Sequence, residues 1–247
     1  MTFDWPGIVE REGGALGDAA AKDPQAAVPA APGWDTTELL RHIGMIHART
    51  SIILRTGTTE RPSRRNGMLP EAPADGVLEW YRTTLAELVA DLRAIDDPDR
   101  PVWAFSPDHA RAGFWPRRMA HETVVHRVDA EQALAGPVAS IEPAFAVDGI
   151  DEVLRVFVPA LGADRSPGDG RTVDLRPTEE ADGWQIRFDP GQVTVETEGW
   201  DEGTADATVR GTAGDLLLWL WGRHPIEGLD VTGDRDAALA LRAVTTF

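Results

Sequence analysis

The sequence contains no cysteine and a single lysine, Lys22, and both facts narrow the chemistry that its own side chains can perform. Without cysteine there are no disulfide bonds, no thiolate ligands for a metal and no thiol nucleophile. Any thiol chemistry must therefore use a thiol that comes from outside the chain. Schiff-base chemistry is excluded unless Lys22 performs it.

Long hydrophobic runs and an excess of positive charge are also missing. No apolar stretch approaches the roughly 18–20 residues that span a membrane. The N-terminus lacks the basic and apolar segments of a signal peptide. We therefore expect a cytoplasmic protein that does not insert into membranes. The formal net charge is -17 and both halves of the chain are acidic, which argues against binding to nucleic acid.

The first half of the sequence predicts a bundle of four helices. Apolar residues recur at helical spacing, most clearly after the capping box Asp35-Thr-Thr-Glu38. Two long loops, 58–74 and 96–116, separate the later helices. Gly136-Pro137 is expected to end the fourth helix. The expected helices cover residues 4–22, 35–57, 75–95 and 116–135.

The pattern changes in the second half, where short alternating segments favour β-strands. A helix is expected over residues 147–161, a second after the capping box Thr212-Ala-Gly-Asp215, and a third from Asp234 to Val244. The expected strands cover residues 172–176, 183–188, 192–197, 204–210 and 229–232. The sequence thus predicts a helical domain over residues 1–140 and an α+β domain over residues 141–247.

The stretch from Arg118 to Asp129 carries the strongest functional signal. Residues four apart on a helix share a face, so Glu122 and His126 point the same way, with Cβ atoms about 5–6 Å apart. Asp129 joins this face, whereas His121 points elsewhere. The spacing differs from the HExxH motif of zinc proteases, in which two histidines lie four residues apart. One carboxylate and one imidazole suit Zn²⁺ or a similar divalent ion.

A third metal ligand must come from another helix, because bundles build metal sites from side chains on facing helices. The second helix offers His42 and His47. His42 is the better candidate, because apolar residues on both sides tie its region to the buried face. We expect His47 to point toward solvent or a neighbouring loop. The plain alternative is an ordinary solvated pair of Glu122 and His126 that binds no metal.

Several segments resemble the mycothiol-dependent maleylpyruvate isomerase family. Residues 33–47 and 118–131 resemble its metal-binding N-terminal domain, and residues 211–223 and 231–234 resemble its smaller C-terminal domain. The likeness covers nearly the whole chain. It implies an N-terminal four-helix bundle of the DinB type followed by a smaller α+β domain of the SCP2-like type.

The same resemblance implies a metal ion and a thiol. Zn²⁺, or a similar divalent ion, would be bound by His42, Glu122 and His126. Mycothiol would supply its sulfur at the open metal position. The implied activity is isomerisation or S-transfer on a small electrophilic, carboxylated substrate.

Other polar residues are candidates for that reaction. A carboxylated substrate needs cationic partners, so Arg223 is a candidate catalytic residue, and Arg64 and Arg65 are candidates for binding the substrate or the thiol. Arg223 has a plainer interpretation as a favourable charge at a helix C-terminus, and the loop pair as ordinary solvated arginines. Asp129 is a candidate catalytic residue that orients a ligand imidazole, or it pairs with a neighbouring arginine.

Two further functions fit the same residues. One is a non-catalytic, metal-containing protein that binds a small acidic or thiol-containing ligand. The other is a hydrolase in which a metal-bound water is the nucleophile. Nothing in the sequence demands an oligomer, so we expect a monomer whose partners are small molecules.

Overall fold

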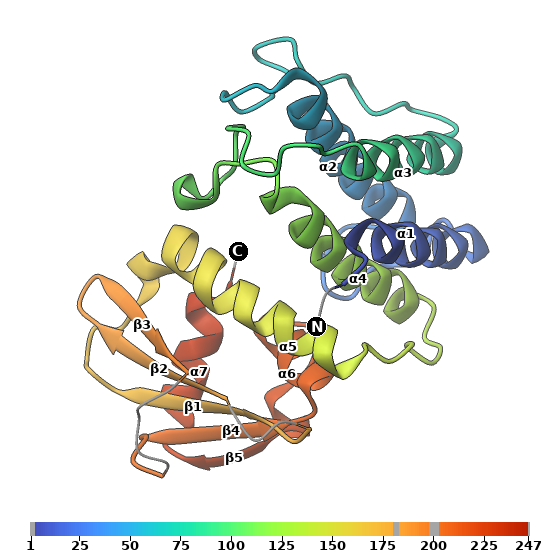
Figure 1. Cartoon of the computed structure of the whole chain (residues 1–247). Helices are drawn as coiled ribbons and strands as arrows, with labels where there is room; N and C mark the ends of the chain where they lie inside the picture. Colours follow the sequence, from blue (N-terminus) through green and yellow to red (C-terminus); the bar gives the residue numbers. More distant parts are fainter. Residues whose placement is uncertain (1–2, 180–182, 198–202, 247) are drawn as a thin grey trace. The chain divides into compact units, whose positions relative to one another are not determined.

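The computed structural model describes residues 3–179, 183–197 and 203–246, and the chain divides into two compact units. The N-terminal unit is Met1–Ala139 and the C-terminal unit is Ser140–Phe247. Figure 1 shows helices α1 to α4 in the first unit, and a sheet with helices α5 to α7 in the second. The predicted succession of a helical bundle and an α+β domain is confirmed.

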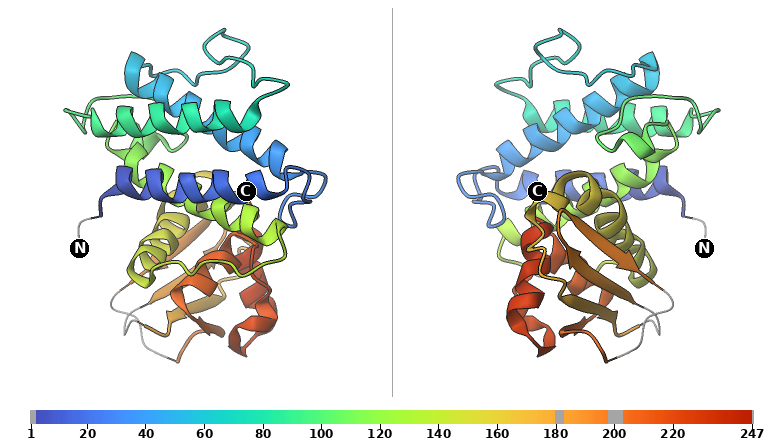
Figure 2. Two further views of the ribbon diagram at one scale, coloured as in Figure 1. Left: turned by 90° about the vertical axis from the view of Figure 1, so that its right-hand side faces the viewer. Right: turned by 90° about the vertical axis from the view of Figure 1, so that its left-hand side faces the viewer.

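The N-terminal unit is built from long helices that lie side by side (Figure 2). Helix α1 packs against α3 and α4, and α2 packs against the same two helices. A short 3-10 turn, η1, precedes α4. The bounds are Trp5–Lys22 for α1, Thr36–Thr56 for α2, Val77–Arg93 for α3, Pro107–His109 for η1 and Phe114–Ala133 for α4.

Local signals fix the ends of the two helices that carry the candidate ligands. The side chain of Asp35 accepts a hydrogen bond from the backbone N–H of Glu38 at 2.8 Å, as the capping box predicts. Gly57 ends α2 in the left-handed conformation. Helix α4 begins at Phe114 rather than at Pro116. Pro116 still lies in the first turn, where backbone N–H groups have no partner within the helix, so its lack of an N–H costs no hydrogen bond.

Close packing explains why α1 tolerates glycine. A Cβ on Gly13 would lie 2.5 Å from Leu85 Cδ1 of α3, and one on Gly17 would lie 3.2 Å from the Tyr81 ring. The Tyr81 hydroxyl donates a hydrogen bond to the Gly13 carbonyl at 2.9 Å. Gly13 and Gly17 would destabilise an isolated helix, but here they allow α1 to lie close to α3.

The C-terminal unit begins with a helix that changes its winding. Helix α5 continues directly into the wider, π-type helix η2, which contains Pro159, a residue without an amide hydrogen to donate. Together they account for the helix that was predicted over residues 147–161. The bounds are Pro143–Glu152 for α5, Val153–Gly162 for η2, Ala163–Arg165 for η3, Ala213–Leu220 for α6, Ile226–Gly228 for η4 and Arg235–Val244 for α7.

The strands of this unit form one mixed sheet in the order β3-β2-β1-β4-β5. Strands β1 and β4 are parallel, and the other neighbouring pairs are antiparallel. All five strands that the alternating pattern predicts are present, with ends that differ by a few residues. The bounds are Thr172–Pro177 for β1, Trp184–Asp189 for β2, Gln192–Glu196 for β3, Ala207–Gly211 for β4 and Asp230–Gly233 for β5.

One face of the sheet supplies the hydrophobic core of the C-terminal unit. Val173, Leu175, Ile186, Phe188 and Val209 alternate along the central strands and are fully buried. They pack in one cluster with the apolar faces of α5, η2, α6 and α7. The strand period of two thus directs these side chains toward the helices.

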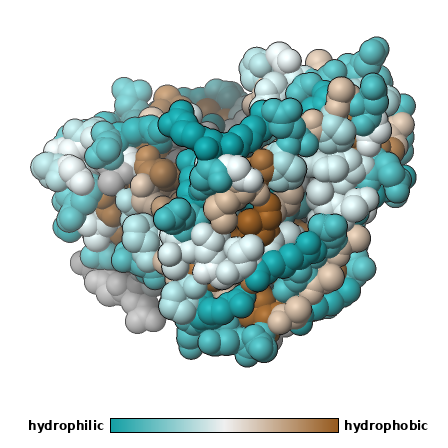
Figure 3. Space-filling model, turned by 90° about the horizontal axis from the view of Figure 1, so that it is seen from above, coloured by the Kyte–Doolittle hydropathy of each residue, from teal (hydrophilic) through white to brown (hydrophobic). Residues whose placement is uncertain are grey.

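The surface is dominated by polar residues, as the charge of the chain implies. Among the described residues, the exposed large hydrophobic side chains are Val138, Leu161 and Leu239. The face drawn in Figure 3 is mostly hydrophilic, and hydrophobic residues show there only in small areas separated by polar ones. In the described part of the chain, no helix is both long and apolar enough to cross a membrane.

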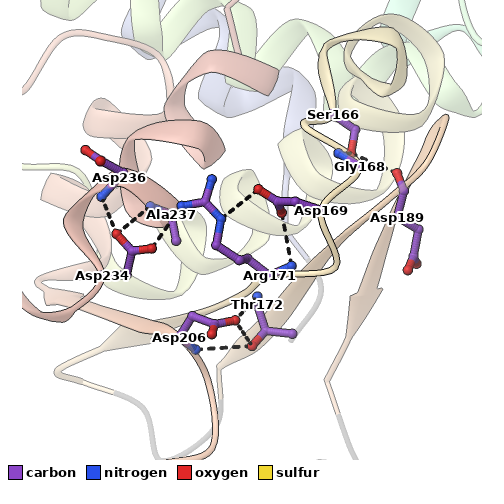
Figure 4. Close-up of polar contacts among 10 residues, drawn as sticks. All are labelled: Ser166, Gly168, Asp169, Arg171, Thr172, Asp189, Asp206, Asp234, Asp236 and Ala237. Atoms are coloured by element: carbon purple, nitrogen blue, oxygen red, sulfur yellow. Dashed lines mark hydrogen bonds and ion pairs between the residues drawn. The ribbon is translucent and has the colours of Figure 1, made fainter.

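Charged contacts join the start of β1 to the segments before β4 and α7 (Figure 4). Arg171 pairs with Asp169 at 2.8 Å and with Asp234 at 2.9 Å. Asp234 is also the N-cap residue of α7. The carboxylate of Asp206 accepts a hydrogen bond from the backbone N–H of Thr172 at 2.7 Å.

The tightest steric constraint in this region lies at Gly233, where φ is 81° and a Cβ would lie 2.2 Å from the carbonyl oxygen of Asp206. We expect Gly233→Ala to lower the free energy of unfolding by clearly more than the about 1–2 kcal/mol that a left-handed alanine costs. Gly191→Ala is the matched control, because its φ is 73° and nothing lies within 4 Å of the added Cβ. Urea unfolding measures both losses, and equal losses would contradict the close approach.

Candidate metal centre

Four ionisable side chains follow one another along a face of α4. Arg118 Nη2 lies 2.7 Å from Glu122 Oε2, and Glu122 Oε1 lies 3.3 Å from His126 Nε2. His126 Nδ1 lies 2.8 Å from Asp129 Oδ2. The helical spacing of four, four and three residues produces this row. The predicted proximity of Glu122, His126 and Asp129 is therefore confirmed.

His42 approaches this row from α2. The ring centroids of His42 and His126 are 5.1 Å apart, with the rings edge to face. One ligand atom of His42, one of Glu122 and one of His126 all lie within 4.8 Å of one another. Within the part of the chain that the structure describes, no other group of three such side chains converges in this way. Trp34 packs against the His42 ring at 4.9 Å between centroids.

The chemistry of these side chains fits a divalent metal ion. Two imidazole nitrogens and one carboxylate oxygen are ligands that Zn²⁺ accepts, and a set of three leaves a coordination position open. The side chains of His126 and Glu122 are 11% and 18% exposed, so the group is shielded but still accessible. Asp129 contacts the far nitrogen of His126, as carboxylates commonly do behind metal-binding imidazoles.

Burial and neighbouring charges oppose each other in setting the pKa values of the group. Burial disfavours the charge on Glu122, but Arg118 and His126 outweigh it and hold the pKa of Glu122 well below its usual range. Burial also disfavours the imidazolium of His126, but hydrogen bonds to Asp129 and Glu122 raise its pKa to about 9. Burial and the nearby His126 lower the pKa of His42 to about 4.

The structure corrects the prediction for His47. This residue was expected to face solvent or a loop, but it is fully buried, with its ring centroid 5.7 Å from that of Tyr81 on α3. The physical reason is that α2 packs against both α3 and α4, so more than one of its faces is buried. His121 is also buried, 5.8 Å from the ring of Trp5, and does not belong to the converging group.

The three arginines that were predicted from the sequence as site residues lie in different parts of the fold. Arg64 lines a cleft that also contains His42. Arg65, in the same loop, is exposed and does not line this cleft. Arg223 follows α6 in the C-terminal unit and donates a hydrogen bond to the Trp221 carbonyl at 2.6 Å. The functions assigned to these arginines from the sequence stay predictions.

Two arginines that lie beside the group were missed. Arg118 supports Glu122 from one helical turn before it, and their spacing of four residues was a sufficient signal. Arg49 lines the cleft seven residues after His42, and that two-turn spacing on one helix could have revealed it.

The pKa shifts predict distinct titrations in the metal-free protein. We expect His126 to stay protonated through neutral pH and to lose its proton near pH 9. His42 should stay neutral until the pH falls to about 4. Assigned ¹H–¹⁵N NMR spectra of the imidazoles measure both. Asp129→Asn is expected to lower the pKa of His126, and an unchanged pKa would contradict the role of the hydrogen bond.

Family models match both units of the chain. The model described as mycothiol maleylpyruvate isomerase N-terminal domain matches residues 8–131, and the MDMPI C-terminal domain matches residues 144–240. Comparison with curated proteins finds no match.

Solved structures agree with the family models on the fold. The crystal structure of the mycothiol-dependent maleylpyruvate isomerase has a TM-score of 0.60 and 14% identity, over 93% of this chain and 92% of that one. A point variant of that enzyme gives 0.61 with the same identity and coverage. A UbiJ-SCP2 ubiquinone synthesis protein matches over 43% of this chain and 93% of its own, at 25% identity and a TM-score of 0.32, which supports no conclusion. Because the family models together cover most of its length, the chain belongs to the mycothiol maleylpyruvate isomerase family.

Proposed function

We propose that this protein is a thiol-dependent isomerase or S-transferase that holds Zn²⁺, or a similar divalent ion, with His42, Glu122 and His126. Mycothiol is the thiol cosubstrate, and a small electrophilic, carboxylated molecule is the substrate. The observation that carries the proposal is the convergence of the three ligand atoms within 4.8 Å. Family membership supports the thiol, and a chain without cysteine must take its sulfur from a cosubstrate.

The residues around the group prepare it for this role. When bound, a divalent ion supplies a Lewis acid that lowers the pKa of a thiol at an open coordination position. Arg118 holds one oxygen of Glu122 and leaves the other facing His126. Asp129 holds Nδ1 of His126, which leaves Nε2 toward Glu122. The low pKa of His42 keeps its lone pair available at neutral pH.

The reaction proposed for the isomerase requires a thiolate and a conjugated double bond. The sulfur forms a bond to one alkene carbon, and the electron pair of the double bond moves toward the conjugated carbonyl. The former carbon–carbon double bond is now a single bond, and rotation about it follows. The electron pair then returns from the carbonyl, the carbon–sulfur bond breaks, and the double bond is restored in the other geometry with the thiolate released unchanged. In an S-transfer, the thiolate instead displaces a leaving group and remains in the product.

Removal of one ligand is expected to abolish metal retention. Protein purified without added zinc and dialysed should contain zinc in the wild type and little in His42→Ala or Glu122→Gln, measured by plasma mass spectrometry. Asp129→Asn should keep the site but weaken zinc affinity about 10–100-fold, because Asp129 only orients a ligand. His109→Ala is the matched control, because His109 lies in η1 outside the group. Unchanged zinc in His42→Ala would show that the site is wrong.

A test for product formation distinguishes an enzyme from a non-catalytic binding protein. We expect the zinc form, incubated with mycothiol and a panel of carboxylated cis-alkenes and alkyl halides, to give a trans product or a thioether by liquid chromatography and mass spectrometry. Glu122→Gln should give neither. Tight thiol binding without product would favour a non-catalytic binding protein, and hydrolysis in the absence of thiol would favour a hydrolase.

A further inference from the structure

A cleft of about 710 Å³ opens between α2 and the loop that follows it, within the N-terminal unit. His42 of the candidate metal centre forms part of its wall. Part of its lining is apolar. Its apolar lining consists of Trp34, Met45, Ile46 and Leu69.

The charge of the cleft is opposite to that of the chain. The chain has a net charge of -17, but the charged residues of the lining are Arg41, Arg49, Arg61, Arg64 and Glu38. Arg41 already pairs with Glu38 and donates to two backbone carbonyls of the loop. In the part of the chain that the structure describes, the other three arginines have no carboxylate partner.

Arg49 is the most constrained of these three arginines. It is half-buried on α2, and its Nε atom is buried without a hydrogen-bond partner among the described residues. Burial and the nearby charge of Arg61 lower its pKa. The positive charge of Arg61 is unfavourable for the half-buried guanidinium of Arg49. An anion that accepts hydrogen bonds from both would relieve the repulsion and satisfy the buried donor.

Arg61 is exposed, and its guanidinium lies beside a pair of aromatic rings. Its Cζ atom lies 5.8 Å from the ring centroid of Trp103. Trp103 in turn stacks on Trp115, a buried residue of the first turn of α4, at 6.1 Å between centroids. A guanidinium held in this way loses little conformational freedom when it binds a ligand.

Arg49 of the cleft lies close to the candidate metal centre. Arg49 and His42 are seven residues apart on α2, about 10 Å along the helix axis. Arg49 is one of the charges that act on His42, and Glu122 is one of those that act on Arg49. Arg49 and His42 line the same cleft, so one ligand there can face both.

We infer that Arg49 and Arg61, assisted by the exposed Arg64, form a subsite that binds the carboxylate of a small organic ligand. Guanidinium groups match the two oxygens of a carboxylate, and the apolar residues of the lining fit a short carbon body rather than a second highly charged group. The subsite assigns residues to the carboxylate of the substrate class proposed above and places the reactive carbons toward His42. The inference rests on the proposed function for that reaction, whereas anion binding itself requires only the arginines.

Isothermal titration calorimetry with succinate tests the subsite in the zinc-loaded and the zinc-free protein. We expect binding in both forms, weakened about 10–100-fold in Arg49→Gln and in Arg61→Gln because a charge-assisted hydrogen-bonding partner is lost. Succinamide, the neutral diamide, should not bind. Arg65→Gln is the matched control, because Arg65 is exposed in the same loop but does not line the cleft. It should bind succinate like the wild type.

Three results would overturn the inference. An equal loss in Arg65→Gln and Arg49→Gln would indicate general attraction by surface charge. Succinate binding that needs zinc and is unchanged in Arg49→Gln would place the carboxylate on the metal. Inorganic phosphate that binds more tightly than succinate would exclude a carboxylate subsite. Measurement of the zinc content distinguishes a failure of this inference from a failure of the proposed function. Arg49→Gln should retain zinc. A wild type that binds succinate but no zinc would contradict only the metal site.

Discussion

The carboxylate of Glu122 is shared between Arg118 and His126, and the polar interior of the N-terminal unit depends on this sharing. An ionised side chain is stable away from water only when it is paired and hydrogen-bonded. Charges along α4 therefore alternate in sign, from Arg118 through Glu122 and His126 to Asp129. Removal of Glu122 takes a carboxylate partner from both Arg118 and His126, so Glu122 is the residue of the row that holds its two neighbours in place.

Helix α2 carries the other polar side chains that lie near this row. His42 contributes a neutral nitrogen, and Arg49, two turns further along, contributes a cation to the adjoining cleft. Because His42 and Arg49 stand on one helix, their separation is set by helix geometry rather than by a loop. The loop arginine, Arg61, lies with its Cζ atom 5.8 Å from the ring centroid of Trp103.

Helical periodicity explains which parts of this site could be predicted from the sequence. Glu122, His126 and Asp129 share a face wherever that segment is helical, and the alternation of the strands likewise reveals the inward face of the sheet. The choice of His42 over His47 relied on the family resemblance more than on the flanking apolar residues, because spacing alone does not tell which side of α2 meets α4. The burial of His47 and the place of Arg61 depend on contacts between distant segments, which no local pattern encodes.

The central claim is that His42 of α2 and two residues of α4 bind one divalent ion. Anomalous X-ray diffraction at the zinc absorption edge, on crystals of zinc-loaded protein, tests it most directly. The account predicts one anomalous peak, within about 2.0–2.2 Å of an imidazole nitrogen of His42, an imidazole nitrogen of His126 and a carboxylate oxygen of Glu122. A peak bonded to other residues, or no peak between these three side chains, would contradict it.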